Sequence, residues 1–161
     1  MNRISVAFFL FFSSLAWTQV SPCAETSAIN EAIIRVVKPT IGKKIERGEC
    51  WDLVQYALNK TDAVWDGLND FGTEYDPKKS CVQPGDVIRF EKVQLEFSDQ
   101  KGNGYTETFG HHYAIVYDVS ATGVLTLIHQ NTGQYGRKVG LTTMDLHHVT
   151  KGKLYFFRPE I

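Results

Sequence analysis

One cysteine has the position in the sequence that a thiol nucleophile needs. Cys50 begins a segment with helical spacing, where unpaired backbone N–H groups and the helix dipole favour a thiolate. We therefore expect a lowered pKa for this thiol. A histidine within hydrogen-bonding distance could accept and return the thiol proton, and a third polar group could orient the imidazole. The sequence must then place a histidine beside Cys50.

Two histidines stand at the ends of neighbouring expected strands. His112 opens the run 112–117, and His129 ends the run 124–129. The start of one strand lies near the end of the next in an antiparallel hairpin, so the two side chains are expected to be cross-strand neighbours. We expect His112 to act as general base and His129 to orient it. Strand alternation places Asn131 on the face of His129 as an auxiliary polar group.

The remaining histidines have a simpler interpretation. His111 is expected on the face opposite His112, although a register change of one residue would exchange the two. His147 and His148 lie in a polar segment and are expected to face solvent. The histidines do not stand at helical i, i+4 spacing and no CxxC motif occurs, so we expect neither a metal nor another cofactor.

The cysteine count is odd, with Cys23, Cys50 and Cys81. In an oxidising compartment one thiol must stay unpaired or pair with another chain. A Cys23–Cys81 disulfide would leave Cys50 free if Cys23 remains in the mature protein, but spacing does not rank the three pairings. A buried structural thiol is the alternative role for Cys50.

The first half of the chain predicts helices and the second half predicts strands. Apolar residues recur at helical spacing over 27–37 and again from Cys50 to Leu58. Residues 61–80 read as an irregular connection, and 141–150 as a polar segment with a short helical turn. Alternating runs predict strands at 87–93, 95–97, 105–109, 113–119, 124–129 and 153–157. Helices followed by an antiparallel meander predict an α+β fold.

The N-terminus has the pattern of a secretory signal. Arg3 is followed by an apolar run over 4–17 with small residues near its end. We expect a signal peptide within residues 1–24, cleaved after Ala16 or after Ala24, and a single domain over 26–161. The apolar run is shorter than the roughly 18 to 20 residues that a membrane span needs, so we expect an exported protein, periplasmic or secreted, without a stable membrane span.

The overall charge of the protein does not indicate a polyanionic partner. The chain has 161 residues, with 17 Lys and Arg against 18 Asp and Glu. This balance does not favour binding to nucleic acid or to an anionic membrane surface. The length fits one hydrophobic core. Partners must therefore be inferred from the candidate site.

Several short segments occur in an order that resembles the CHAP and NlpC-type peptidases, which are compact relatives of papain. The resemblance covers about residues 29 to 159. The chain also resembles the cysteine-proteinase-like domain of fungal proteins that bind myosin tails. The segments are Gly48-Glu49-Cys50-Trp51-Asp52-Leu53-Val54, Pro84-Gly85-Asp86-Val87-Ile88, His112-Tyr113-Ala114-Ile115-Val116 and His129-Gln130-Asn131.

This resemblance implies a papain-like fold, with N-terminal helices packed on a mostly antiparallel sheet. Cys50 matches the nucleophile of the peptidases, His112 the base, His129 the third position and Asn131 an assisting polar residue. Residues 45–49 lack the Tyr or Gln with which many relatives complete the oxyanion hole. That difference puts turnover in doubt more than the fold.

The resemblance also implies an activity and a substrate. The expected activity is hydrolysis of amide bonds, as an amidase or endopeptidase, through an acyl-enzyme, and the expected substrate is a cell-wall peptide. Two alternatives are a non-catalytic protein-interaction module of the same fold and an acyltransferase that uses the same cysteine and histidine.

Overall fold

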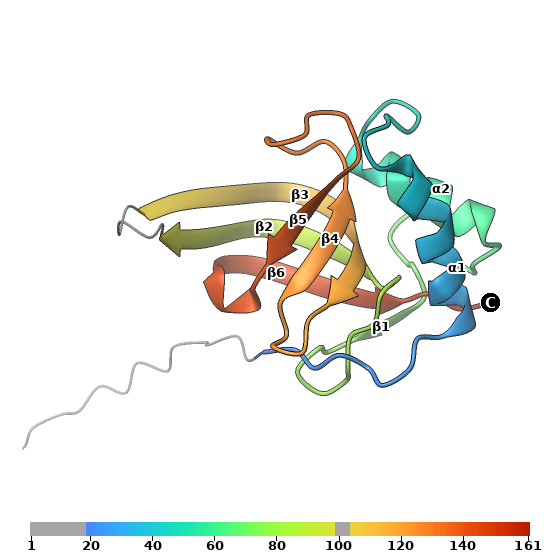
Figure 1. Cartoon of the computed structure of the whole chain (residues 1–161), viewed down its shortest axis with the longest axis horizontal. Coiled ribbons are helices and arrows are strands. Elements are labelled where there is room, and N and C mark those ends of the chain that lie inside the picture. The colour runs from blue at the N-terminus through green and yellow to red at the C-terminus, as the bar shows by residue number, and fades with distance from the viewer. Residues whose placement is uncertain (1–18, 99–103) are drawn as a thin grey trace, which may run out of the picture.

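The structure is a computed structural model that describes residues 19–98 and 104–161. Two helices pack on an antiparallel sheet whose strand order is β1-β6-β2-β3-β4-β5 (Figure 1). This arrangement confirms the expected α+β class. The elements are α1 (Ala28–Val37), η1 (Lys38–Thr40), α2 (Cys50–Lys60), β1 (Thr73–Tyr75), β2 (Val87–Ser98), β3 (Gly104–Val119), β4 (Leu125–His129), β5 (Gly140–Met144), η2 (Leu146–His148) and β6 (Val149–Arg158).

Both predicted helices are confirmed, and their starts follow from local capping. Ser27 caps α1 by accepting a hydrogen bond from the backbone N–H of Asn30. A capping box at α2 pairs Glu49 with Asp52, whose carboxylate accepts the Glu49 N–H at 3.0 Å. The box sets the first turn of α2 at Cys50, where the sequence predicts it.

The strands are longer than the sequence predicts. The runs 87–93 and 95–97 form one strand, β2, and the runs 105–109 and 113–119 form one strand, β3. The two strands pair along almost their whole length as a hairpin that reaches beyond the rest of the sheet (Figure 1). Lys92 has a positive φ of 52°, and the pairing of β2 with β6 shifts register there. This irregularity interrupts the alternation and makes one strand look like two.

Two strands were missed by the sequence prediction. β1 lies inside the segment predicted to be irregular, and β5 lies inside the ambiguous segment 141–150, together with the short helical turn η2. β1 has three residues, too few for a period of two to be seen, and it is defined by its pairing with β6. Both strands lie at the edges of the sheet.

The sheet separates two apolar clusters. On one face, Ile115 and Ile128 pack against helix residues such as Ile33 and Leu53. On the other face, Val116 and Leu127 pack with residues of β2 and β6. Successive residues of a strand point to opposite faces, so neighbours in β3 and β4 enter different clusters.

The described chain begins with a packed segment before the first helix. Val20 is buried, the Ser21 carbonyl accepts the Val82 N–H at 2.8 Å, and Cys23 forms a disulfide with Cys81. Cys50 is a free cysteine. The structure thus selects one of the pairings that the sequence left open, and it places residues before 26 within the folded domain. No helix in the described ranges is long and apolar enough to cross a membrane.

Candidate functional site

The structure brings His112 and His129 together. His112 lies in β3 and His129 ends β4, and Nε2 of His112 is 2.9 Å from Nδ1 of His129. Nε2 of His129 lies 2.9 Å from Oγ1 of Thr142 in β5. Three neighbouring strands therefore hold a continuous chain of polar groups on one face of the sheet.

These contacts are consistent with Nδ1 of His112 as a base. If Nε2 of His112 carries the proton, it donates to Nδ1 of His129, and Nε2–H of His129 donates to the Thr142 hydroxyl. Both rings are then neutral, and Nδ1 of His112 keeps its lone pair. Among the described residues, Nδ1 of His112 has no hydrogen-bond partner.

Burial keeps both imidazoles neutral. The pKa of His112 falls to about 3, mainly through burial and to a smaller extent through the proximity of His129 and His111. Burial also lowers the pKa of His129 to about 4. The rings of Phe90 and Phe109 lie 5.5 Å and 4.9 Å from the His112 ring and cover much of its surface. Neither histidine is therefore an imidazolium at neutral pH.

Cys50 begins α2, and its sulfur contacts the strand that carries His112. Burial raises the pKa of the thiol, and the Glu49 carboxylate raises it slightly more. The backbone N–H groups of Tyr113, Trp51 and Cys50 itself favour the thiolate and offset part of this rise in pKa. The expected lowered pKa is wrong, because burial outweighs the N–H groups of the helix start.

His112 and Cys50 approach β3 from different sides. Tyr113, which directly follows His112 in β3, packs with Trp51 of α2 on the helix face of the sheet. The His112 ring packs with Phe90 and Phe109 on the other face. In the part of the chain that the structure describes, the sulfur makes no hydrogen bond to either imidazole. The only enclosed side-chain nitrogen or oxygen without a hydrogen-bond partner in these residues is Nε of Arg89, so Nδ1 of His112 keeps contact with solvent. In unliganded enzymes, catalytic hydrogen bonds are often long and tighten in the substrate complex.

Gln130 is a site residue that the sequence did not identify. Its Nε2 donates to the carbonyls of Ile45 at 3.1 Å and Glu49 at 2.7 Å, and its Oε1 accepts the Ile45 N–H at 3.1 Å. These bonds tie the loop that leads into α2 to the end of β4. The only sequence signal was its place directly after His129. Because its amide is fully engaged, Gln130 does not supply the missing donor of an oxyanion hole.

Asn131 does not join the imidazoles. Its φ of 61° follows the last residue of β4 and ends the strand alternation on which the expectation depended. Its Nδ2 donates to Oε2 of Glu49 at 2.7 Å. Asn131 therefore supports the start of α2, and the expected assistance to His129 is not seen.

His111 lies on the opposite face from His112, as the alternation predicts. Its Nδ1 is 2.8 Å from Oε1 of Glu91, and its Nε2 is 2.6 Å from the Tyr113 hydroxyl. Both nitrogens are occupied, so His111 is the weaker candidate for the base. His147 and His148 are exposed, and the described residues contain no group of three or more His, Cys, Asp or Glu that could hold a metal ion.

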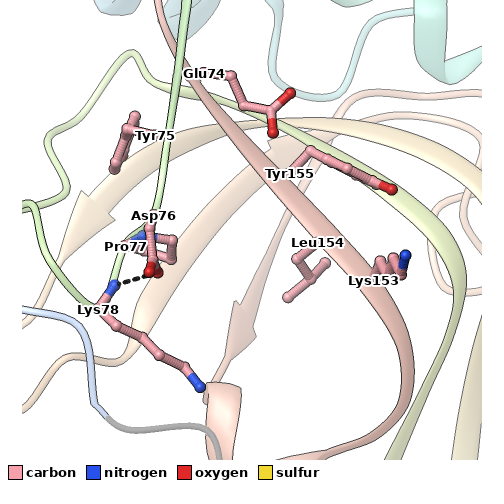
Figure 2. Close-up of a pocket in the computed structure, with 8 residues that line it drawn as sticks. All are labelled: Glu74, Tyr75, Asp76, Pro77, Lys78, Lys153, Leu154 and Tyr155. Carbon is pink, nitrogen blue, oxygen red and sulfur yellow. Dashed lines mark hydrogen bonds between the residues drawn. The ribbon is translucent and has the colours of Figure 1, made fainter.

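A surface hollow of about 440 Å³ lies away from these groups. Figure 2 shows its walls, which come from β1, the turn that follows it and the middle of β6. Tyr75, Leu154 and Tyr155 form its apolar part, and neither Cys50 nor His112 lines it. His129 and Thr142 instead line a separate apolar recess on the face of the sheet away from the helices, with Phe90, Leu127 and Met144.

Comparisons with known proteins identify one match. The family model described as the AIM3/BBC1 cysteine proteinase-fold domain matches residues 23–160. No curated protein and no solved structure matches the chain significantly. The match supports a papain-like fold and does not point to the CHAP or NlpC-type peptidases in particular.

Proposed function

Because this chain belongs to the AIM3/BBC1 cysteine proteinase-fold family, we propose that it uses that fold as a cysteine hydrolase of amide bonds, with Cys50 as nucleophile and His112 as base. One observation carries the proposal: the polar contacts from His112 to His129 and Thr142 leave Nδ1 of His112 without a hydrogen-bond partner among the described residues. Because the His112 ring packs on the face of the sheet away from α2, the proposal requires this ring to move towards Cys50 when a substrate binds.

The proposed reaction begins from a neutral pair. Nδ1 of His112 takes the thiol proton as the Cys50 sulfur attacks the substrate carbonyl carbon. The C–N bond then breaks, and His112 returns the proton to the departing amine. Water attacks the thioester, gives one proton to Nδ1 and releases a carboxylic acid, and the proton returns to the sulfur. His129 keeps the His112 ring in the tautomer that these steps require.

The pKa values favour proton transfer during attack over a preformed ion pair. Burial raises the pKa of the thiol and lowers that of His112 to about 3, so both groups are neutral in the free protein. The Cys50 backbone N–H at the start of α2 is the group we propose as an oxyanion donor. The site needs a substrate that completes the water-excluded pocket.

We also propose that the protein is exported. Three features support this: the apolar N-terminal run, the Cys23–Cys81 disulfide, which is typical of oxidising compartments, and the packing of Val20. Cleavage after Ala24 would remove Cys23, so we propose the cut after Ala16. Intact-mass measurement of the exported protein tests this, and a mature chain that begins at Glu25 would contradict it.

The proposed substrate class is a cell-wall peptide, on the resemblance to CHAP and NlpC-type peptidases and the proposed export. The test incubates purified peptidoglycan with the mature wild type and with Cys50→Ala and follows released peptides by mass spectrometry. New amine and carboxylate ends that depend on Cys50 are expected. Absence of release, together with no acyl-enzyme from p-nitrophenyl acetate, would overturn the hydrolase.

A non-catalytic interaction module remains the second candidate. The observation in its favour is that the thiol is largely buried and has no hydrogen bond to an imidazole within the described residues. In that role Cys50 would be a small apolar residue at a helix start. It predicts that Cys50→Ala folds normally and binds the same partners as the wild type.

A further inference from the structure

One edge of β6 is open beyond the end of β1. β1 has three residues, and its last pair with β6 is Tyr75 opposite Phe156. On its other side β6 continues to pair with β2 as far as Val149. Among the described residues, no strand pairs with residues 149–155 of β6 on the side of β1. The backbone N–H and C=O groups that point to this side are therefore available to another strand.

The surface hollow of about 440 Å³ lies along this open edge. Pro77 lies in the turn that follows β1 and has no N–H with which to continue the ladder. The turn and β1 form one wall of the hollow, and residues 153–155 of β6 form the other (Figure 2). Tyr75 and Leu154 belong to the face of the sheet away from the helices, and Tyr155 belongs to the helix face. The hollow thus continues the path of β1 along β6 and offers apolar surface on both faces.

The two ends of the hollow differ in charge. Glu74 lies where β1 pairs with β6, whereas Lys153 lies beyond that pairing. Lys153 is exposed and has no ion-pair partner in the part of the chain that the structure describes. The Asp76 carboxylate accepts the backbone N–H of Lys78 at 3.0 Å, so it is engaged within its own turn. The end of the hollow at Lys153 therefore favours an acidic side chain.

Lysines on this edge oppose a second copy of the protein as the occupant. Antiparallel pairing of two β6 edges would bring Lys151 and Lys153 of both copies close together, and like charges on facing strands destabilise a sheet. Lysines on edge strands are a common device against such self-association. An acidic partner converts the same charges into an attraction.

We propose that the open edge of β6 binds an extended acidic peptide segment of another protein, which adds a strand antiparallel to β6 where β1 ends. An apolar residue of this segment lies opposite Leu154 and an acidic residue lies opposite Lys153. Backbone hydrogen bonds supply the affinity, and the alternating side chains supply the specificity. The proposal goes beyond the proposed function, because neither Cys50 nor His112 lines this surface.

The test uses the peptide Thr-Val-Glu-Val-Glu-Val with blocked ends and a fluorescein label, and it measures binding to the mature protein by fluorescence anisotropy. Wild type should bind with a dissociation constant of about 1 mM or tighter. Lys153→Glu should weaken this binding about threefold to tenfold and should favour the charge-reversed peptide Thr-Val-Lys-Val-Lys-Val by a similar factor. No binding of the acidic peptide at about 2 mM protein would overturn the proposal.

A matched variant controls for net charge. Lys138→Glu makes the same change of charge at an exposed position in the loop before β5, at the opposite end of the strand order. It should change the affinity for the acidic peptide by less than about twofold. Equal losses for Lys138→Glu and Lys153→Glu would mean that only overall charge attracts the peptide, and the proposal would be wrong.

Modified peptides test the added strand itself and need only the wild-type protein. Backbone groups of successive residues in a strand point to opposite edges, so N-methylation of the Val amides blocks one edge of the peptide and N-methylation of the Thr and Glu amides blocks the other. One of these two peptides should lose binding by about tenfold or more, and the other should keep it. Equal effects of the two modifications would overturn the proposal.

Two further measurements separate other occupants and the hydrolase from this proposal. A dimer of the free protein in sedimentation equilibrium that the acidic peptide does not dissociate would assign the edge to a second copy, against the proposal. Cys50→Ala should bind the peptide within about twofold of the wild type, because Cys50 does not line the hollow. A larger loss would place the peptide at the thiol and overturn the proposal. Turnover of p-nitrophenyl acetate tests the hydrolase alone.

Discussion

The two faces of the sheet give adjacent histidines opposite surroundings. His112 is 4% exposed, its polar partner is the neutral ring of His129, and burial lowers its pKa to about 3. The His111 side chain is 52% exposed and lies beside the Glu91 carboxylate. The strand alternation that separates the two residues thus decides which imidazole stays neutral and which is paired with a charge. The neutral imidazole lies on the face away from α2, and the imidazole beside a carboxylate lies on the face that carries the helices.

The largest expected effect separates the two histidines by activity. His112→Ala should reduce Cys50-dependent hydrolysis of p-nitrophenyl acetate by roughly 10² to 10⁴-fold, because the proton acceptor is lost. His111→Ala should reduce it by about tenfold or less, because both nitrogens of His111 are engaged by Glu91 and the Tyr113 hydroxyl. Release of p-nitrophenolate measures both, with Cys50→Ala as the baseline. A larger loss for His111→Ala would exchange the roles of the two residues.

The second prediction compares the two histidines by stability against pH. Folding lowers the pKa of His112 to about 3 and that of His129 to about 4, below the unfolded value near 6.5. The unfolded chain therefore binds more protons in this range, so stability is full above pH 6.5 and falls as the pH drops towards 3. The loss between pH 7 and pH 4.5 should be on the order of 5 kcal/mol for the two residues together, measured by urea unfolding.

Matched variants test whether His112 and His129 cause this loss of stability in acid. His112→Leu combined with His129→Leu should flatten the pH dependence, whatever its effect on stability at pH 7. His111→Leu should keep the slope, because its ring is half exposed and paired with a carboxylate. If the double variant loses stability in acid as steeply as the wild type, other groups are responsible.

The third prediction tests the contact between Thr142 and His129, at the end of the row of polar groups that begins at His112. Thr142→Val keeps the shape of the side chain and removes the partner of Nε2 of His129. The free energy of unfolding should fall by about 1 to 2 kcal/mol, because a buried N–H loses its acceptor. Thr143→Val is the control at an exposed neighbouring position, with an expected change below about 0.5 kcal/mol. Equal losses would mean that Thr142 does not hold His129.

The sequence predicted the features that depend on local periodicity. The helices follow from apolar spacing, and the proximity of His112 and His129 follows from the geometry of a hairpin. The opposite placement of His111 follows from alternation. These relations connect residues within one element or between two consecutive elements, so the spacing of residues along the sequence is enough to predict them.

The features that the sequence did not predict depend on contacts between distant parts of the chain. The raised pKa of the Cys50 thiol comes from burial in the cluster that α1, α2 and the sheet form together, which helix position alone does not reveal. β1 exists only because β6 pairs with it, and the Cys23–Cys81 pairing joins residues separated by 58 positions. Gln130 links β4 to the loop before α2. None of these contacts leaves a periodic signal.

The smallest expected effect concerns Asn131, which the sequence placed beside the imidazoles. Its φ of 61° allows glycine, so Asn131→Gly removes the bond to Glu49 without straining the backbone. Glu49 keeps Arg137 at 3.2 Å, so stability should change by about 0.5 kcal/mol or less. Hydrolysis of p-nitrophenyl acetate should stay within about twofold, because neither face of the sheet loses a partner of its histidine. A fall of tenfold or more would show that Asn131 reaches His129 during turnover, and the separation between the two faces would then be less strict than the free structure indicates.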